Sequence, residues 1–136
     1  MPDGRLPGLS FVTGLFICSA VSANSGGVSL MFDVQPLFDS YCVSCHMLES
    51  PQGELVIEQG EAHSNLVKVP STQAEMVRVD PGNPTSSYLL HKMRGTHLEA
   101  GGSGLPMPYG SEVSAGMSAD ALDLIERWIA EGAPDN

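Results

Sequence analysis

The residues best suited to chemistry in this 136-residue chain form one short cluster, Cys42-Val-Ser-Cys45-His46. Two close thiols can form a disulfide, act as a redox-active pair or anchor a cofactor. The adjacent histidine favours the anchor, because it supplies a metal ligand beside two attachment points. Thiols at this spacing reach both vinyl groups on one porphyrin edge, and the imidazole then lies beneath the ring. The C-x-x-C-H sequence therefore predicts one covalently attached haem c, with Cys42 and Cys45 as thioethers and His46 on the iron.

Two other kinds of site could use the same cysteines. A zinc site would need two further Cys or His ligands at suitable spacing, and His63, His91 and His97 offer no close pair. A thioredoxin-like dithiol would need a β-α-β pattern, which the sequence lacks. Zinc binding and thiol redox chemistry therefore stay open as alternatives, both disfavoured by the surrounding sequence.

A haem held by His46 on one face leaves the other face of the iron for a second ligand. Methionine is the usual choice in electron transfer, and it raises the reduction potential relative to two histidines. Among the seven methionines, Met107 stands out because Pro106 and Pro108 bracket it and restrict its backbone. A stiff loop presents a ligand at little ordering cost, so we expect Met107 to bind the iron. His97 and an open sixth position are the alternatives, and the open position would favour a haem enzyme or ligand sensor.

Three helices are expected to position these groups. The first is predicted over residues 33–42, with Pro36 in its first turn, where proline is tolerated. The second is predicted over residues 83–93, with Asn83 as N-cap and a stop at Gly95. The third is predicted to begin at Ser118 and to end by Gly132. Apolar residues at helical spacing support the first and last helices: Val34, Leu37, Phe38 and Tyr41 in one, and Leu122, Ile125 and Ile129 in the other, where Leu124 and Trp128 flank the face.

Long irregular segments separate the predicted helices. Residues 47–82 contain only two strand-like pieces, Leu55-Val-Ile57 and Met76-Val-Arg-Val79, and residues 97–117 form a glycine-rich loop. Such long stretches without regular structure are unusual in a compact domain and need a surface to pack against. A haem would supply that surface. The predicted fold is an all-α domain of three helices, with long loops wrapped around one haem.

The order of these features resembles class I c-type cytochromes, and most closely the small cytochrome-c-like domains of exported planctomycete and other bacterial proteins. The resemblance covers residues 34–133. It rests on Val34-Gln-Pro-Leu-Phe38 before the C-x-x-C-H motif, on Pro81-Gly-Asn-Pro-Thr-Ser-Ser-Tyr-Leu89, on Met107-Pro108 and on the last helix. It implies that the first and last helices cross beside the haem, with Phe38 and Trp128 at the crossing. It also implies Met107 as the distal ligand.

The N-terminus has the pattern of a secretory signal peptide. A short apolar run, Phe11-Val-Thr-Gly-Leu-Phe-Ile17, precedes Val21 and Ala23 at the −3 and −1 positions of a small-residue cleavage site. The run is too short to span a bilayer permanently. We expect a signal peptide at 1–23, a linker at 24–32 and the haem domain at 33–136. The protein would then be periplasmic or otherwise exported, with lipid anchoring through Cys18 as the alternative.

Charge points to the class of partner. Six Lys and Arg oppose 16 Asp and Glu, a formal net charge of −10. This excess argues against nucleic acid and anionic membranes, and it suits redox partner proteins with basic docking surfaces. The predicted function is a single-haem cytochrome that carries one electron at a time between exported or membrane partners and is not itself an enzyme. A haem enzyme or ligand sensor and a small haem subunit of a larger oxidoreductase are the alternatives.

Overall fold

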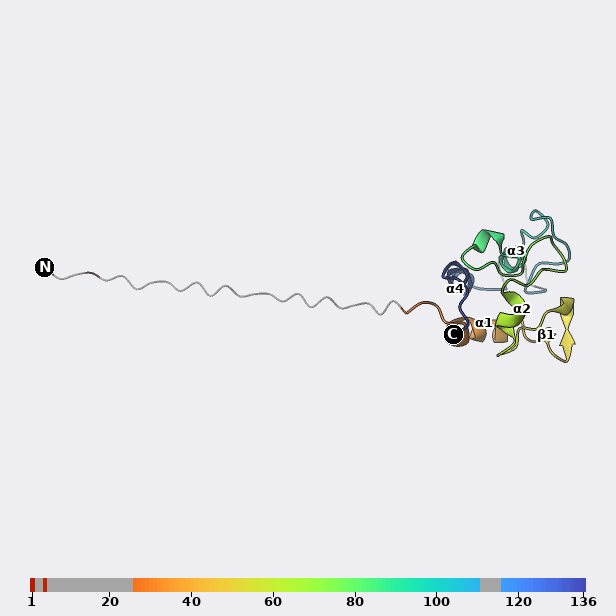
Figure 1. Ribbon diagram of the computed structural model, residues 1–136, viewed down its shortest axis with the longest axis horizontal. Coiled ribbons are helices and arrows are strands. Elements are labelled where there is room, and N and C mark those ends of the chain that lie inside the picture. Colours follow the sequence, from red (N-terminus) through yellow and green to blue (C-terminus); the bar gives the residue numbers. More distant parts are fainter. Residues whose placement is uncertain (2–3, 5–25, 111–115) are drawn as a thin grey trace.

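The computed structural model describes Met1, Gly4 and residues 26–110 and 116–136. The predicted signal peptide, with its cleavage site, and Cys18 lie outside the described residues. The described chain forms a small, mostly helical domain with long connecting segments (Figure 1). In chain order its elements are the π-helical turn η1 (Leu30–Val34), α1 (Gln35–Tyr41), β1 (His46–Met47), β2 (Ser50–Pro51), the 3-10 turn η2 (Gln52–Glu54), α2 (Ala62–Leu66), the 3-10 turn η3 (Pro84–Ser86), α3 (Tyr88–Arg94) and α4 (Ala119–Ala130).

The domain begins earlier than the sequence predicted. Val28 and Leu30, assigned to the linker, are buried in the hydrophobic core. Their backbone is held by the C-terminal end of the chain, since Val28 N donates to Glu131 Oε2 at 2.6 Å and Leu30 N donates to Asn136 Oδ1 at 2.8 Å. The predicted linker, 24–32, is therefore folded into the domain from Val28 onward.

The first predicted helix, 33–42, corresponds to two helical segments of different type. Residues Leu30–Val34 form the π-helical turn η1, and α1 follows over Gln35–Tyr41. Pro36 lies in the first turn of α1, as predicted. Proline has no N–H to donate to the carbonyl four residues earlier, so the regular helical ladder is interrupted at this point. Val34 and Phe38, from the predicted apolar stripe, are completely buried.

The last helix crosses the first at an aromatic contact. Phe38 and Trp128 pack edge to face, with ring centroids 6.5 Å apart and planes at 84°, which confirms the expected contact. The predicted cap also forms, because Ser118 Oγ accepts from the Ala121 N–H at 3.2 Å. The buried face of α4 (Ala119–Ala130) is rotated relative to the predicted face, because Trp128 is completely buried while Leu122 is only partly buried.

The second predicted helix, 83–93, is also interrupted. A 3-10 turn over Pro84–Ser86 ends at Ser87, whose backbone is extended, and α3 begins at Tyr88. The Ser87 hydroxyl is buried and donates to the Asn83 carbonyl at 2.9 Å. It also accepts from the Asp80 N–H at 2.9 Å. Ser87 is thus the N-cap residue of α3, whereas the predicted cap Asn83 precedes the 3-10 turn, and neither side chain makes a capping hydrogen bond. The helix stops at Gly95, as predicted, in the left-handed conformation.

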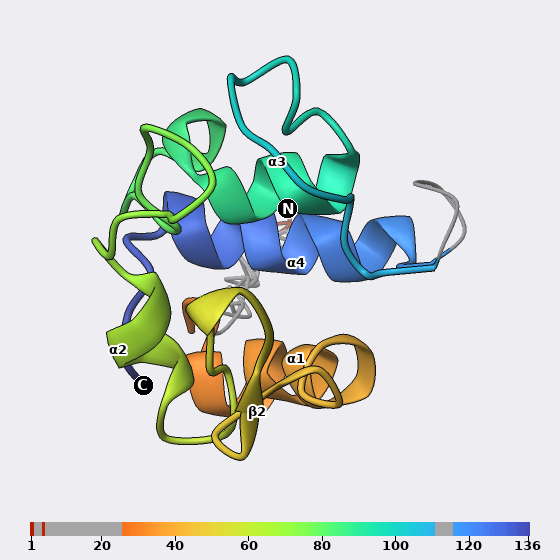
Figure 2. The same cartoon turned by 90° about the vertical axis from the view of Figure 1, so that its right-hand side faces the viewer.

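Helix α4 is the centre of the helical packing. In Figure 2 it is drawn between α3 and α1. An ion pair between Arg94 and Glu126 joins α3 to α4 (side chains one-third exposed). Trp128 joins α4 to Phe38 of α1. Residues from these helices thus share one hydrophobic core.

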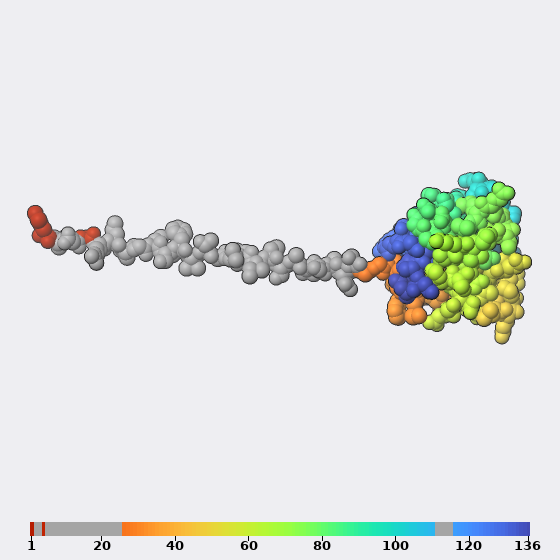
Figure 3. Space-filling model, in the orientation of Figure 1, coloured from red at the N-terminus to blue at the C-terminus, as the bar shows by residue number. Residues whose placement is uncertain are grey.

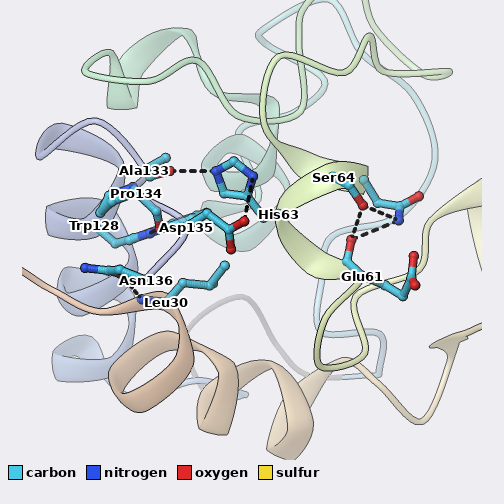
Figure 4. Close-up of polar contacts among 10 residues, drawn as sticks. Leu30, Glu61, His63, Ser64, Trp128, Ala133, Pro134, Asp135 and Asn136 are labelled. Atoms are coloured by element: carbon cyan, nitrogen blue, oxygen red, sulfur yellow. Dashed lines mark hydrogen bonds and ion pairs between the residues drawn. The ribbon is translucent and has the colours of Figure 1, made fainter.

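The C-terminal residues 133–136 fasten that core on its outer side. Figure 4 shows them between η1 and α2, where His63 Nε2 donates to the Ala133 carbonyl at 3.0 Å. On the other side, the Asn136 carboxamide oxygen accepts from the Leu30 N–H. His63 is therefore engaged with the chain end, and its two ring nitrogens face residues of the tail.

The irregular segment 47–82 contains more structure than predicted, and of another kind. Its strand-like pieces do not form named strands. Instead Val79 bridges to Val67, and Val77 bridges to Pro70, as isolated pairs. The segment also contains α2, which the sequence analysis missed because five residues are too few to show a helical repeat. The described domain therefore has four α-helices where three were expected.

Candidate functional site

The end of α1 brings the two thiols and the imidazole to one place. Cys42 follows α1, and its N–H still donates to the Phe38 carbonyl at 2.8 Å. The chain then turns tightly, because the N–H groups of Cys45 and His46 both donate to the Cys42 carbonyl, each at 3.1 Å. The motif is thus a local turn built on the residue that directly follows the helix. We call residues 42–52 the proximal segment.

Both cysteines carry free thiols. Burial, together with the smaller effect of the neighbouring Cys45, raises the pKa of the Cys42 thiol to about 12. Cys45 is exposed. The two sulfurs therefore differ in environment, one against the protein interior and one towards solvent.

The His46 ring is oriented by a short hairpin. Strands β1 and β2 pair antiparallel, with His46 opposite Pro51, and this brings Gln52 back over the imidazole. The Gln52 carbonyl oxygen lies 2.8 Å from Nδ1, which donates its proton to it. A neutral imidazole with its proton on Nδ1 keeps a lone pair on Nε2. Such a second-sphere bond is the usual way to fix a metal-binding histidine.

The surroundings also favour the neutral form of this histidine. Burial lowers the pKa of His46, although hydrogen bonds to the carbonyls of Gln52 and Leu55 oppose the effect. Repulsion from the cations Arg78 and Lys92 lowers it further. A neutral imidazole is the form that binds a metal.

A cavity of about 350 Å³ opens beside this imidazole. It is lined by Cys42, His46 and Met107, so the structure brings three of the four predicted haem-binding residues to one space. Within the part of the chain that the structure describes, Cys45 is not in the lining. Much of the remaining wall is apolar and comes from Leu55, Ile57, Leu66, Leu89, Met93, Leu105 and Pro108. The yellow segment around β1 and the cyan loop that follows α3 both lie towards the right-hand side of the domain in Figures 1 and 3.

Met107 reaches the cavity on a loop fixed to α3. Its N–H donates to the Lys92 carbonyl at 2.9 Å. The peptide bond between Met107 and Pro108 is cis. Met107 itself is half-buried. We call residues 96–108 the distal loop.

The cavity also contains two cations that were not predicted as site residues. Arg78 and Lys92 line it, whereas no Asp or Glu does among the residues with described positions. Lys92 is 8% exposed, and its Nζ donates to Gln73 Oε1 at 2.8 Å and to the Ser103 carbonyl at 3.2 Å. The sequence could have indicated that Lys92 lies near Tyr88, because the two residues are four apart and therefore on the same helical face.

The other candidate ligands are engaged elsewhere. His97 is buried, and its Nε2 lies 3.0 Å from the Gly104 carbonyl. It does not belong to the described lining of the cavity. His91 uses both ring nitrogens, towards Thr96 Oγ1 at 2.8 Å and the Thr85 carbonyl at 3.0 Å. Met93, which the sequence analysis passed over, does line the cavity and is buried.

Two further properties concern the described residues as a whole. Across 26–110 and 116–136, no set of three or more His, Cys, Asp and Glu side chains is arranged to hold a metal ion. Over the same ranges, no helix has the length and apolar character needed to cross a membrane.

Comparison with known proteins finds a solved structure in which part of the chain follows a similar path. No protein-family model and no curated protein sequence matches. A solved structure titled Kuenenia stuttgartiensis hydrazine synthase is 23% identical, with a TM-score of 0.49. The match covers 78% of this chain and 16% of that one. The chain thus spans less than a fifth of that protein's length.

Proposed function

We propose that this protein is a single-haem c-type cytochrome that carries one electron at a time between exported or membrane redox partners. One observation carries the proposal: Cys42, His46 and Met107 line the same cavity, although Met107 lies far along the chain from the other two. A thiol, an imidazole and a thioether around one apolar space are the groups that a covalently attached, six-coordinate haem requires.

The chemistry of the cavity fits a haem. A porphyrin has broad apolar faces and two carboxylates, so it needs an apolar wall and a cationic region. The wall is rich in Leu and Met side chains. Arg78 and Lys92 supply positive charge, and no described carboxylate in the lining opposes them. In a chain of net charge −10, cations concentrated at a cavity favour an anionic occupant.

Each residue of the site then has a defined role. Cys42 and Cys45 would hold the haem covalently, through thioether bonds to its two vinyl groups. His46 offers the Nε2 lone pair, while its Nδ1 proton stays on the Gln52 carbonyl. Met107 offers its thioether sulfur from the opposite loop. A haem held in this way supplies an iron that gains and loses a single electron, at a potential raised by methionine relative to a second histidine.

The surface around the cavity suits brief encounters with partner proteins. Leu48, in the proximal segment, is 63% exposed, and Leu105, in the distal loop, is 54% exposed. Small apolar contacts of this kind suit electron-transfer complexes that form and break quickly. We propose that this edge meets basic docking surfaces and that the protein is exported, as its predicted signal peptide implies. A permanent place as a subunit of a larger oxidoreductase would use the same chemistry.

The visible spectrum of the full chain, produced with a haem-attachment system, tests the proposal. We expect a c-type spectrum and, in the oxidised protein, the weak long-wavelength iron–sulfur charge-transfer band of methionine ligation. A haem spectrum without this band, combined with cyanide binding as tight as in an open site, would favour the enzyme or sensor alternative. Protein that takes up no haem would contradict the proposal altogether.

A further inference from the structure

Two side chains converge on the backbone of one residue in the distal loop. The Tyr88 hydroxyl lies 3.2 Å from the Ser103 carbonyl, to which it donates. The same hydroxyl accepts from the Ser103 N–H at 3.3 Å. Lys92, one helical turn further along α3, donates to that carbonyl and to Gln73 Oε1. We call Gln73, Tyr88 and Lys92 the Ser103 clamp.

The clamp joins three separate parts of the chain. Tyr88 and Lys92 lie on α3, Ser103 lies in the distal loop, and Gln73 belongs to the irregular segment before α3. Ser103 Oγ also lies 3.4 Å from the Gln73 carbonyl. Tyr88 is 4% exposed and Lys92 is 8% exposed, so these bonds are largely shielded from competing water.

The residues on either side of Ser103 are shaped for this contact. A Cβ on Gly102 would lie 2.3 Å from the Tyr88 hydroxyl oxygen, far inside contact distance. Gly104 has a φ of +80°, and a Cβ there would lie 3.0 Å from Gln73 Nε2. Glycine on both sides of Ser103 therefore permits a close approach that other residues would block.

Ser103, the residue that the clamp holds, lies only four residues before Met107 in the chain. Met107 is itself fixed to α3, through its N–H bond to the Lys92 carbonyl. Both ends of segment 103–107 are thus attached to the same helix. Ordering a short segment before a ligand binds lowers the conformational entropy that binding must overcome.

We propose that the Ser103 clamp is a positioning device that keeps the Met107 sulfur at the iron and so sets how readily another ligand can replace it. The inference rests on the proposed function, because it assumes that Met107 is the distal ligand. Tyr88 acts through the loop and not on the iron. Loss of its hydroxyl removes both bonds to Ser103 and lets Met107 leave more often. An external ligand then binds more tightly in proportion to the open fraction.

Cyanide titration of the oxidised, haem-containing full chain tests the clamp. Tyr88→Phe should raise the apparent cyanide affinity by about tenfold, since each lost hydrogen bond shifts the equilibrium several-fold. Tyr109→Phe is the matched control, because Tyr109 lies just beyond the same loop and is 72% exposed. That control should bind cyanide as the wild type does. Gly102→Ala disrupts the clamp from the loop side and should change the affinity in the same direction as Tyr88→Phe.

The iron–sulfur band and the unfolding midpoint, measured beside the cyanide affinity, distinguish failure of the clamp from failure of the proposed function. Wild-type protein with a normal iron–sulfur band, together with unchanged cyanide affinity in Tyr88→Phe, would overturn the clamp while leaving the proposed function intact. A lower unfolding midpoint without a change in cyanide affinity would also overturn it, because Tyr88 would then only stabilise the fold. Absence of the band from the wild type would instead count against Met107 ligation itself.

Discussion

The proximal segment and the distal loop hold their proposed ligands in different ways. In the proximal segment, two thiols, the imidazole and the carbonyl that orients it all lie within residues 42–52. In the distal loop, Met107 depends on bonds to α3 and, through the Ser103 clamp, on Gln73. One side is organised by its neighbours in sequence, and the other by contacts across the fold. Changes in the first should therefore abolish a property, whereas changes in the second should alter an equilibrium.

The largest effect is expected from removing the proximal thiols. Replacing Cys42 and Cys45 with Ala should abolish covalent attachment, because no other described cysteine lies at the cavity. Denaturing gel separation followed by haem peroxidase staining measures this directly. The wild-type band should stain and the double variant should not. Haem that stays with the polypeptide in the double variant would contradict attachment at this motif.

The two thiols should also differ from each other before haem is attached. With a pKa of about 12, Cys42 has a thiolate fraction at pH 8 about a thousandfold below that of an ordinary thiol. Cys45 is exposed. Iodoacetamide should therefore modify Cys45 first in haem-free protein beginning at Asn24, as peptide mass spectrometry can follow. Equal rates would mean that the proximal segment is not ordered until haem binds.

Removing the distal sulfur should leave the haem in place but open the iron. Met107→Ala should lose the long-wavelength band and gain at least about a hundredfold in cyanide affinity, because no protein ligand then competes. Absorption spectra and cyanide titration measure both effects. Met93→Leu is the matched control, since Met93 also lines the cavity. A band that disappears in the control and persists in Met107→Ala would reassign the ligand.

The smallest effect concerns the surface that both regions share. Electron transfer to a basic redox partner should slow by about tenfold as salt rises from 0.1 to 1 M, because the Debye length falls from about 10 Å to about 3 Å. Transfer to an acidic partner should become faster. Stopped-flow rates over an ionic-strength series test both. Rates that do not change with salt for either partner would contradict electrostatic steering and favour a permanent subunit.

The features that could be predicted from the sequence are those that, like the proximal segment, depend on residues close together in the chain. The C-x-x-C-H turn, the Ser118 cap, the Gly95 stop and the burial of Phe38 depend on spacings of a few residues, and all are readable from the chain. Met107 was selected for its two flanking prolines and not for any contact. Its arrival at the same cavity as His46 was an expectation that short-range patterns alone could not establish.

Tertiary structure decided the features that depend on distant partners. Val28 and Leu30 are held by residues at the other end of the chain, and the predicted second helix breaks where the buried Ser87 hydroxyl bonds to Asp80. The position of the Lys92 ammonium group depends likewise on distant partners, the Gln73 side chain and the Ser103 carbonyl. Buried polar groups must find hydrogen-bond partners wherever the fold supplies them. Local sequence therefore determined which groups could bind a haem, and long-range hydrogen bonding and burial decided how the chain surrounds the cavity.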